Sequence, residues 1–154
     1  MSYTQPPPLT EDEIFSFLKE QKTAKICSLN MDGTVHVTSL WYLYNDAEMI
    51  MLTPAATRKV RNLSRNNTVT VFVDDPETGR GVLIWGKAKL ERKYSFRDSI
   101  ALYEKYMPLR QAARFAREMS TVAKGGAVMI TIKPERIVSF DKTKDKVLKF
   151  SEEP

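Results

Sequence analysis

The sequence has little of the chemistry that metal cages and disulfide frameworks require. Its 154 residues include one cysteine, Cys27, and one histidine, His36. A single cysteine excludes a disulfide within the chain, and one cysteine with one histidine cannot form a Cys/His zinc cage. Catalytic triads, GxGxxG loops and Walker sequences are also missing from the pattern. We therefore expect no metal site and a reducing, cytoplasmic setting.

Long hydrophobic runs and a strong charge of one sign are missing too. No apolar run approaches the length of a membrane span. Residues 1–8 lack the basic segment and apolar core of a signal peptide, so we expect neither export nor a membrane partner. The 24 Lys and Arg residues against 19 Asp and Glu give a net charge of +5. This charge permits acidic ligands such as phosphates or nucleic acid but selects none of them.

The length of the chain predicts a single domain over residues 1–154. Three consecutive prolines at positions 6–8 make residues 1–9 an extended lead-in. Thr10 and Glu13 have the spacing of a capping box, which predicts a helix from there to about Gln21. Residues 142–154 are charged and are expected to be a flexible tail.

Apolar periodicity and turn residues predict a mainly β (α+β) fold. Strands are predicted at 23–29, 34–44, 48–53, 68–74, 81–91 and 127–133, with a further one at 137–140. Helices are predicted at 10–21, 58–65 and 94–119, the last broken by Pro108. Gly86 is predicted to mark a bulge or a close approach of two backbones. Six to seven short strands joined by hairpins favour a closed antiparallel barrel with peripheral helices over a parallel sheet.

The stretch from Thr53 to Leu63 carries the clearest functional signal, at the end of one predicted strand and the start of a helix. Thr53 offers a hydroxyl, Arg58 a guanidinium fork that can grip two phosphate oxygens, and Lys59 a compact charge. The free N–H groups and the dipole of a helix N-terminus also favour an anion. The stretch therefore predicts a phosphate site, with a solvated basic helix start as the alternative.

Several motifs, in this order, resemble those of the pyridoxamine 5'-phosphate oxidase-like flavoproteins. They are Leu29-x-x-Asp32-Gly33-x-x-His36-Val37-x-x-Leu40-Trp41, Met51-Leu52-Thr53, Arg58-Lys59-Val60-Arg61-Asn62-Leu63, Val69-x-Val71-x-Val73-Asp74 and Ile84-x-Gly86-x-Ala88, with a looser similarity over residues 129–141. The resemblance implies a split β-barrel that binds FMN at the interface of a homodimer. It also implies an oxidoreductase in which the protein orients the flavin and the flavin performs the redox chemistry on a small-molecule substrate.

The resemblance also implies roles for individual residues. Thr53, Arg58 and Lys59 match the residues that meet the flavin phosphate, and Asn62 matches one that caps or braces their turn. Six residues resemble the strand that passes along the edge of the isoalloxazine ring: His36, Val37, Thr38, Ser39, Leu40 and Trp41. Trp85 and Gly86 match a strand that approaches from the second subunit. Catalytic residues remain unknown, and a structural role is the alternative for His36, Trp41 and Trp85.

Several functional alternatives stay open. The chain lacks the basic C-terminal segment with which true pyridoxamine phosphate oxidases grip their substrate, so the substrate is unknown. The deazaflavin F420 is an alternative cofactor, whose acidic tail would need a basic groove that includes Arg61, Arg65 and the helical region 94–119. That helical region is otherwise interpreted as an amphipathic pair packed on the barrel with solvated cations. A flavin store without turnover is another alternative, and a nucleic-acid-binding module is the least favoured because the charges are scattered.

Overall fold

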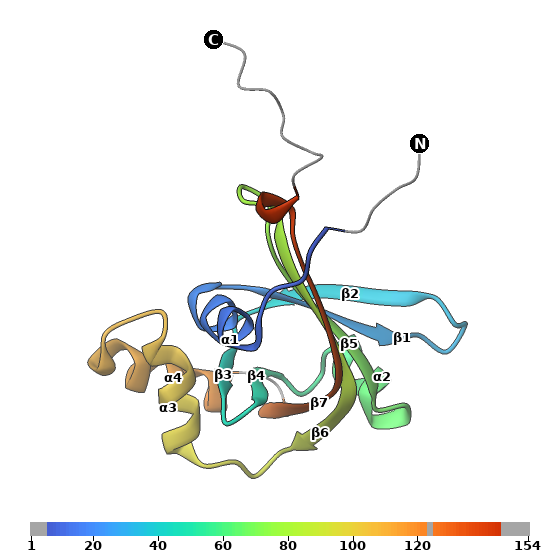
Figure 1. The fold of residues 1–154 in the computed structure, drawn as a ribbon. Coiled ribbons are helices and arrows are strands. Elements are labelled where there is room, and N and C mark those ends of the chain that lie inside the picture. The colour runs from blue at the N-terminus through green and yellow to red at the C-terminus, as the bar shows by residue number, and fades with distance from the viewer. Residues whose placement is uncertain (1–5, 123–124, 146–154) are drawn as a thin grey trace.

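The computed structural model describes residues 6–122 and 125–145 (Figure 1). Within that part of the chain, seven strands form one antiparallel sheet in the order β2-β1-β5-β6-β7-β4-β3. The strands are β1 (Ala24–Leu29), β2 (Val35–Leu40), β3 (Leu43–Asn45), β4 (Glu48–Pro54), β5 (Thr68–Asp75), β6 (Arg80–Glu91) and β7 (Ala127–Asp141). The helices are α1 (Glu11–Glu20), α2 (Arg58–Arg65), α3 (Phe96–Glu104), α4 (Leu109–Val122) and the 3-10 turn η1 (Lys142–Lys144).

The sheet curls because its two edge strands are consecutive in the chain. β2 ends at Leu40 and β3 begins at Leu43, so Trp41 and Tyr42 alone connect the opposite edges of the sheet. Three Cα-to-Cα steps span at most about 11 Å, which forces the two edges together at this end. The β1–β2 hairpin accordingly crosses the long β5, β6 and β7 strands (Figure 1). The split antiparallel barrel expected from the sequence is confirmed.

The predicted single strand over residues 34–44 is wrong, because the structure divides it into β2 and β3. Tyr42 follows β2 and precedes β3 in the chain, belongs to neither strand and is fully buried. Its N–H donates to the Tyr106 hydroxyl at 2.8 Å and its own hydroxyl donates to the Leu18 carbonyl at 2.6 Å. These contacts turn the chain from one edge of the sheet to the other.

The separate strands predicted at 127–133 and 137–140 are also wrong, since both belong to the continuous strand β7. The register between β6 and β7 shifts where Trp85 faces Arg136 and Gly86 faces Pro134. A proline has no N–H to donate and is tolerated at such a bulge. A Cβ on Gly86 would collide with the Lys133 carbonyl oxygen, so the predicted bulge and close approach at Gly86 are confirmed.

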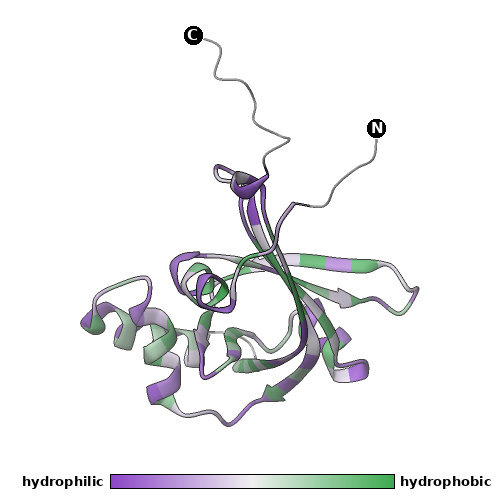
Figure 2. Cartoon of the chain, viewed as in Figure 1, coloured by the Kyte–Doolittle hydropathy of each residue, from purple (hydrophilic) through white to green (hydrophobic). Residues whose placement is uncertain are grey.

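The helices cover the barrel at different places. α1 has the predicted capping box and buries Phe17 and Leu18 in the barrel core. α3 and α4, separated near Pro108 as predicted, pack together on the outward-facing side chains of β4 and β7. α2 lies on the other side of the molecule, against β1 and β6 (Figure 1). In Figure 2 the helices carry both hydrophilic and hydrophobic colour, and hydrophobic colour runs along parts of the long strands.

The segment before α1 is hydrogen-bonded to the C-terminal end of β7. Asp141 N–H donates to the Pro7 carbonyl at 2.8 Å, and Leu9, which is buried, donates its N–H to the Ser139 hydroxyl at 2.9 Å. Within the predicted tail, Lys144 of η1 pairs with Glu13 of α1 at 2.5 Å. The rest of the predicted lead-in and tail, residues 1–5 and 146–154, lies outside the described residues. Among those that are described, no helix has the length and apolar character needed to cross a membrane.

Candidate functional site

The start of α2 places a buried lysine beside a buried threonine hydroxyl. Thr53, near the end of β4, is 1% exposed, and Lys59 in the first turn of α2 is 8% exposed. Lys59 Nζ donates to Thr53 Oγ1 at 3.3 Å, and burial lowers the pKa of the Lys59 amine. In the described part of the chain no carboxylate pairs with this amine. A buried cation with one neutral partner is costly, and an anion placed beside it would offset that cost.

The N-terminus of α2 adds further donors to this site. Thr57 is the N-cap residue, but its side chain makes no capping hydrogen bond. Thr57 Oγ1 is buried and has no hydrogen-bond partner within residues 6–122 and 125–145. The first N–H groups of a helix lack acceptors inside the helix, and no acidic residue stands in this first turn. The helix end therefore favours an anion through its dipole and its free donors.

Packing on both sides of Lys59 explains why its side chain points inward. Val60 and Leu63 are buried on the inner face of α2, and Val60 packs with Ala55 and Val128. The loop before the helix is fixed because Ala55 N–H donates to the Gly126 carbonyl at 2.9 Å. This packing directs the Lys59 amine toward Thr53 and leaves only 8% of the residue exposed.

Asn62 joins α2 to β1. It is buried, and its Nδ2 donates to Ser28 Oγ at 3.1 Å and to Asn30 Oδ1 at 3.0 Å. The resemblance predicts that Asn62 braces the phosphate turn; the structure gives it partners on β1 and on the β1–β2 turn. Neither Ser28 nor Asn30 was singled out from the sequence, because 34 and 32 residues separate them from Asn62.

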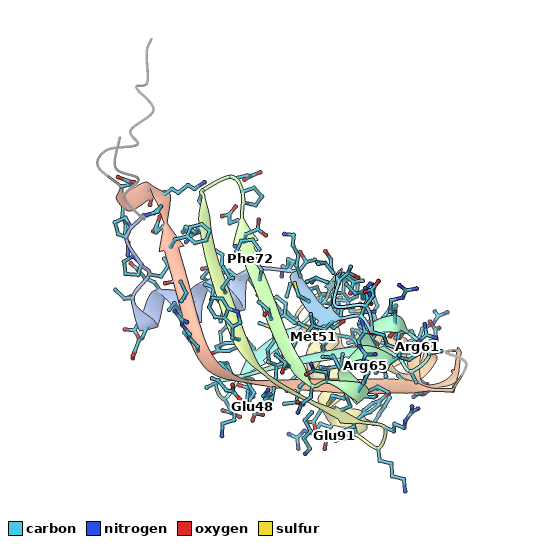
Figure 3. All side chains as sticks on the ribbon, turned by 90° about the vertical axis from the view of Figure 1, so that its right-hand side faces the viewer. Glu48, Met51, Arg61, Arg65, Phe72 and Glu91 are labelled. Carbon is cyan, nitrogen blue, oxygen red and sulfur yellow. The ribbon has the colours of Figure 1, made fainter. Side chains whose placement is uncertain are left out.

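A second group of cations on α2 faces solvent. Arg58, Arg61 and Arg65 are exposed and stand three and four residues apart, so they share one face of the helix. They line an open depression of about 480 Å³ together with Asn30, Met31, Asp32, Thr34 and Asn62. Arg61 and Arg65 lie on the same side of the molecule in Figure 3. Hydrogen bonds from Thr34, with a smaller contribution from the charge of Arg58, hold the pKa of Asp32 below its usual range.

The structure thus separates two residues that the sequence suggested as a pair. Lys59 points into the protein beside Thr53, whereas Arg58 is exposed in the depression near Asp32. Successive residues of a helix point about 100° apart, so the two cations face different surroundings.

The strand expected to run along the cofactor, residues 36–41, is the edge strand β2 and its first following residue. Its side chains alternate between the two faces of the sheet, with Val37 52% exposed. His36 pairs with Ser28 and Thr38 with Ile26, so these side chains share the inner face, as does Leu40 opposite Ala24. Thr38 Oγ1 is a second buried hydroxyl without a hydrogen-bond partner among the described residues. Ser39 lies on the outer face with Val37.

Trp85 lies on the outer face of the sheet, away from the barrel interior. Cross-strand pairing places it in one row with Thr70, Cys27 and Val37. The Arg136 guanidinium lies 5.3 Å from the centroid of its ring. Within one chain, therefore, Trp85 and the inward-facing Thr53 stand on opposite faces of the sheet, while Gly86 is buried at the bulge.

An aromatic and cationic cluster near Trp41 was not assembled from the sequence. Trp41 stacks on Tyr106 with ring centroids 4.5 Å apart. Nearby, Lys105 Nζ lies 3.7 Å from the centroid of the Tyr42 ring and donates to the Leu18 carbonyl at 3.4 Å. Burial and the neighbouring charge of Lys22 lower the pKa of Lys105 to about 8. The sequence contains these residues, but only the tertiary fold brings α1, α3 and the β2–β3 connection together.

No group of three or more His, Cys, Asp or Glu side chains suited to a metal ion occurs in residues 6–122 and 125–145. Amine, hydroxyl and backbone N–H donors at the start of α2 are groups suited to hold an anion.

Comparisons with known proteins agree with this fold. A family model described as "Pyridoxamine 5'-phosphate oxidase" matches residues 10–141. The solved structures that match include a conserved hypothetical protein from Mycobacterium tuberculosis, with a TM-score of 0.75 and 24% identity over 92% of this chain and 89% of that one. An F420 reductase matches with a TM-score of 0.64 and 20% identity, over 79% and 93% of the two chains. A heme storage protein from Vibrio cholerae matches with a TM-score of 0.66 and 18% identity, over 88% and 98%. A search of curated proteins found no match.

Proposed function

Because the chain belongs to the family of pyridoxamine 5'-phosphate oxidase-like proteins, we propose that it is a flavin-dependent oxidoreductase that holds the phosphate of FMN at the start of α2. The observation that carries the proposal is the buried Lys59 amine, whose one hydrogen-bond partner in the described chain is the Thr53 hydroxyl. A phosphate there would accept charge-assisted hydrogen bonds from Lys59 and hydrogen bonds from Thr53, Thr57 and the helix N–H groups. Arg58, at the rim, would add charge.

The proposal includes a homodimer. The β1–β2 hairpin leaves apolar side chains in water, with Leu29 36%, Val35 59% and Val37 52% exposed. β2 is also an edge strand, and its hydrophobic colour stands out in Figure 2. An apolar edge is normally covered, and a two-fold partner would cover the same surface on both copies. Trp85, on the same outer face of the sheet, would then approach the site of the other copy, as the resemblance implies.

When bound, the flavin would supply hydride transfer to or from a small-molecule substrate. The residues of this chain would bind and orient it: Lys59 and Thr53 at the phosphate, and the β2 backbone along the ring. We assign no catalytic residue, since His36 faces Ser28 on the inner face of the sheet and carries no contact that points to proton transfer. The single cysteine favours a cytoplasmic setting.

The phosphate site is tested with Lys59→Met and a matched control, Lys87→Met. Lys87 Nζ also donates to a threonine hydroxyl, that of Thr68 at 2.8 Å, but this lysine is exposed. We expect Lys59→Met to weaken FMN binding at least about tenfold, because a hydrogen bond to a charged group contributes about 1.5–3 kcal/mol. Riboflavin, which lacks the phosphate, should bind both variants and the wild type alike. An FMN affinity of Lys59→Met within about twofold of the wild type would show that the phosphate lies elsewhere.

A second candidate cofactor is F420, and the line of Arg58, Arg61 and Arg65 favours it. One phosphate cannot use three cations spread along two turns of helix, whereas a long acidic tail can. The similarity in fold to an F420 reductase is compatible with this alternative. Arg61→Ala distinguishes the two cofactors: it should weaken F420 binding about fivefold and leave FMN binding within about twofold. Equal and weak effects on both cofactors would remove the reason to consider F420.

A further inference from the structure

Four aromatic rings form a wall beside the end of β2, which we call the Trp41 wall. Trp41 stacks on Tyr106 with planes 11° from parallel and centroids 4.5 Å apart. Tyr103 meets the indole edge-on at 6.3 Å, and Phe115 lies 5.9 Å from it. Tyr103 comes from α3, Phe115 from α4 and Tyr106 from the connection between them. The Trp41 wall therefore joins β2 to the helical pair.

Tyr106 fixes the main chain next to Trp41. Its hydroxyl accepts a hydrogen bond from Tyr42 N–H at 2.8 Å, and the carbonyl oxygens of Lys22 and Tyr42 are each 2.8 Å away to accept its own hydrogen. The Tyr106 ring also faces the Lys22 and Lys105 amines, at 5.7 and 5.6 Å from its centroid. The indole is therefore held in one place before any ligand arrives, which lowers the entropic cost of binding.

β2 links the Trp41 wall to the phosphate site. At one end of the strand, Asn30 and Met31 of the β1–β2 turn line the same depression as Arg58 of α2. At the other end, Trp41 follows the strand and packs against Tyr103 of α3 and Phe115 of α4. Six residues of extended chain span roughly 17–20 Å. A cofactor anchored at the start of α2 and extended along β2 would have its far end near Trp41.

Although it packs against three other rings, Trp41 remains 38% exposed, whereas its neighbour Tyr103 is 3% exposed. An electron-rich indole with one face packed and another surface in water is suited to stack on a second flat ring, an arrangement that contributes about 0.5–1.5 kcal/mol beyond the buried area. We propose that Trp41 is the stacking residue for the substrate, that the substrate carries a flat conjugated ring, and that Tyr106 is the positioning residue for the indole. The proposal rests on the proposed function, because it takes the end of β2 as the substrate end of the site.

The test compares two anions of equal charge and similar size by isothermal titration calorimetry: 2-naphthoate, which is flat, and decahydro-2-naphthoate, which is puckered. Wild-type protein should bind the flat anion about fivefold more tightly than the puckered one. Trp41→Leu should bring the two affinities within about twofold, and Trp41→Phe should restore part of the preference. The matched control is Phe15→Leu, which removes another half-exposed ring, 45% exposed and 6.1 Å from Tyr44, and should keep the full preference.

The positioning role of Tyr106 is measured separately. Trp85→Phe leaves Trp41 as the single tryptophan of the chain, which has two. In that background Tyr106→Phe keeps the stacked ring but removes the hydroxyl that holds Tyr42. We expect the fluorescence anisotropy of Trp41 to fall and the preference for 2-naphthoate to decrease. Unchanged anisotropy and preference would remove Tyr106 from the proposal.

Three results would overturn the role of Trp41. One is a Trp41→Leu variant that keeps the preference for 2-naphthoate. A second is a Trp41→Leu variant that binds FMN about fivefold more weakly and keeps the wild-type preference for 2-naphthoate. The indole would then belong to the cofactor site. A third is dissociation of a wild-type dimer by Trp41→Leu in sedimentation velocity, which would make Trp41 an interface residue. If no flavin binds but the flat-ring preference depends on Trp41, the proposed function fails and this inference stands.

Discussion

Lys59 and Lys105 are both withdrawn from water, and burial lowers the pKa of both amines, yet their surroundings differ. Lys105 lies 3.7 Å from the centroid of the Tyr42 ring and donates to the Leu18 carbonyl, so the protein itself compensates its charge. Lys59 has a neutral hydroxyl at 3.3 Å and an uncapped helix end beside it. The first arrangement is complete within the described chain, whereas the second still lacks a negative charge.

This difference is the reason for proposing Lys59, and not Lys105, as a binding lysine, since both residues are shielded from water and the pKa shift has the same direction for both. A residue that stabilises the fold should affect stability when it is changed and leave ligand affinity alone. A residue kept for a ligand should do the opposite, and its removal should even stabilise the unliganded protein.

The largest effect is expected for Lys59→Met, measured by urea unfolding with and without FMN. FMN at about 100 times its Kd should stabilise the wild type by about 2.7 kcal/mol, and a variant that binds about tenfold more weakly by about 1.4 kcal/mol. Without FMN the variant should be at least as stable as the wild type, because an uncompensated buried charge has been removed. A large loss of stability without FMN would instead make Lys59 structural, like Lys105.

Tyr106→Phe should have an effect of similar size, on stability and not on FMN affinity. The change removes the acceptor of the Tyr42 N–H, and an unsatisfied buried donor costs about 1–3 kcal/mol. Thermal unfolding should report a lower midpoint for Tyr106→Phe. Tyr94→Phe is the control, since the Tyr94 hydroxyl makes no hydrogen bond with other residues of the described chain, and its midpoint should not change. A Tyr106→Phe variant as stable as the wild type would show that the region around Lys105 does not hold the fold together.

Local patterns explain why much of the fold was predictable. The capping box of α1, the Asp32-Gly33 turn and the bounds of α2 depend on residues that are neighbours in the sequence. The start of α2 could be proposed as an anion site for the same reason, because the strand end, the turn and the cations are contiguous in the sequence. Local pattern could not show that Lys59 turns inward while Arg58 stays outside, since that depends on how Val60 and Leu63 pack against the barrel.

The errors occur where distant residues decide the structure. The division between β2 and β3 depends on Tyr42, which is held by Tyr106, 64 residues further along the chain. The continuity of β7 depends on pairing with β6 and on the space left by Gly86. The Trp41 wall likewise joins residues from α3, from α4 and from two connecting segments. Periodicity could identify these residues as apolar, but it could not show which rings pack together. Whether Trp85 reaches a cofactor depends on a second copy and stays a prediction.

The smallest expected effect is a pH dependence of stability that Lys105 contributes. The pKa of Lys105 is about 8 in the folded protein and near 10.5 in the unfolded chain. Between these values the unfolded chain binds more protons, so stability should rise with pH from about 8 to about 10.5 and stay at its lower level below pH 8. Lys105→Met should reduce this rise, measured by urea unfolding at pH 7 and pH 9.5. Lys19→Met, which removes an exposed lysine 4.3 Å from the Phe15 ring, should not change it.

The same pH series, repeated with bound FMN, compares the two lysines directly. Lys59 contributes a rise of the same sign in the unliganded protein, because its pKa is also lowered by burial. A phosphate beside the amine would raise the pKa of Lys59 again, so Lys59 would no longer contribute to the rise in stability with pH. The part of the rise in stability with pH that Lys105→Met removes should be the same with and without FMN. The reason is that the Tyr42 ring and the Leu18 carbonyl already compensate the charge of Lys105. If bound FMN instead abolished the part of the pH dependence that Lys105 contributes, the roles assigned to the two lysines would be reversed.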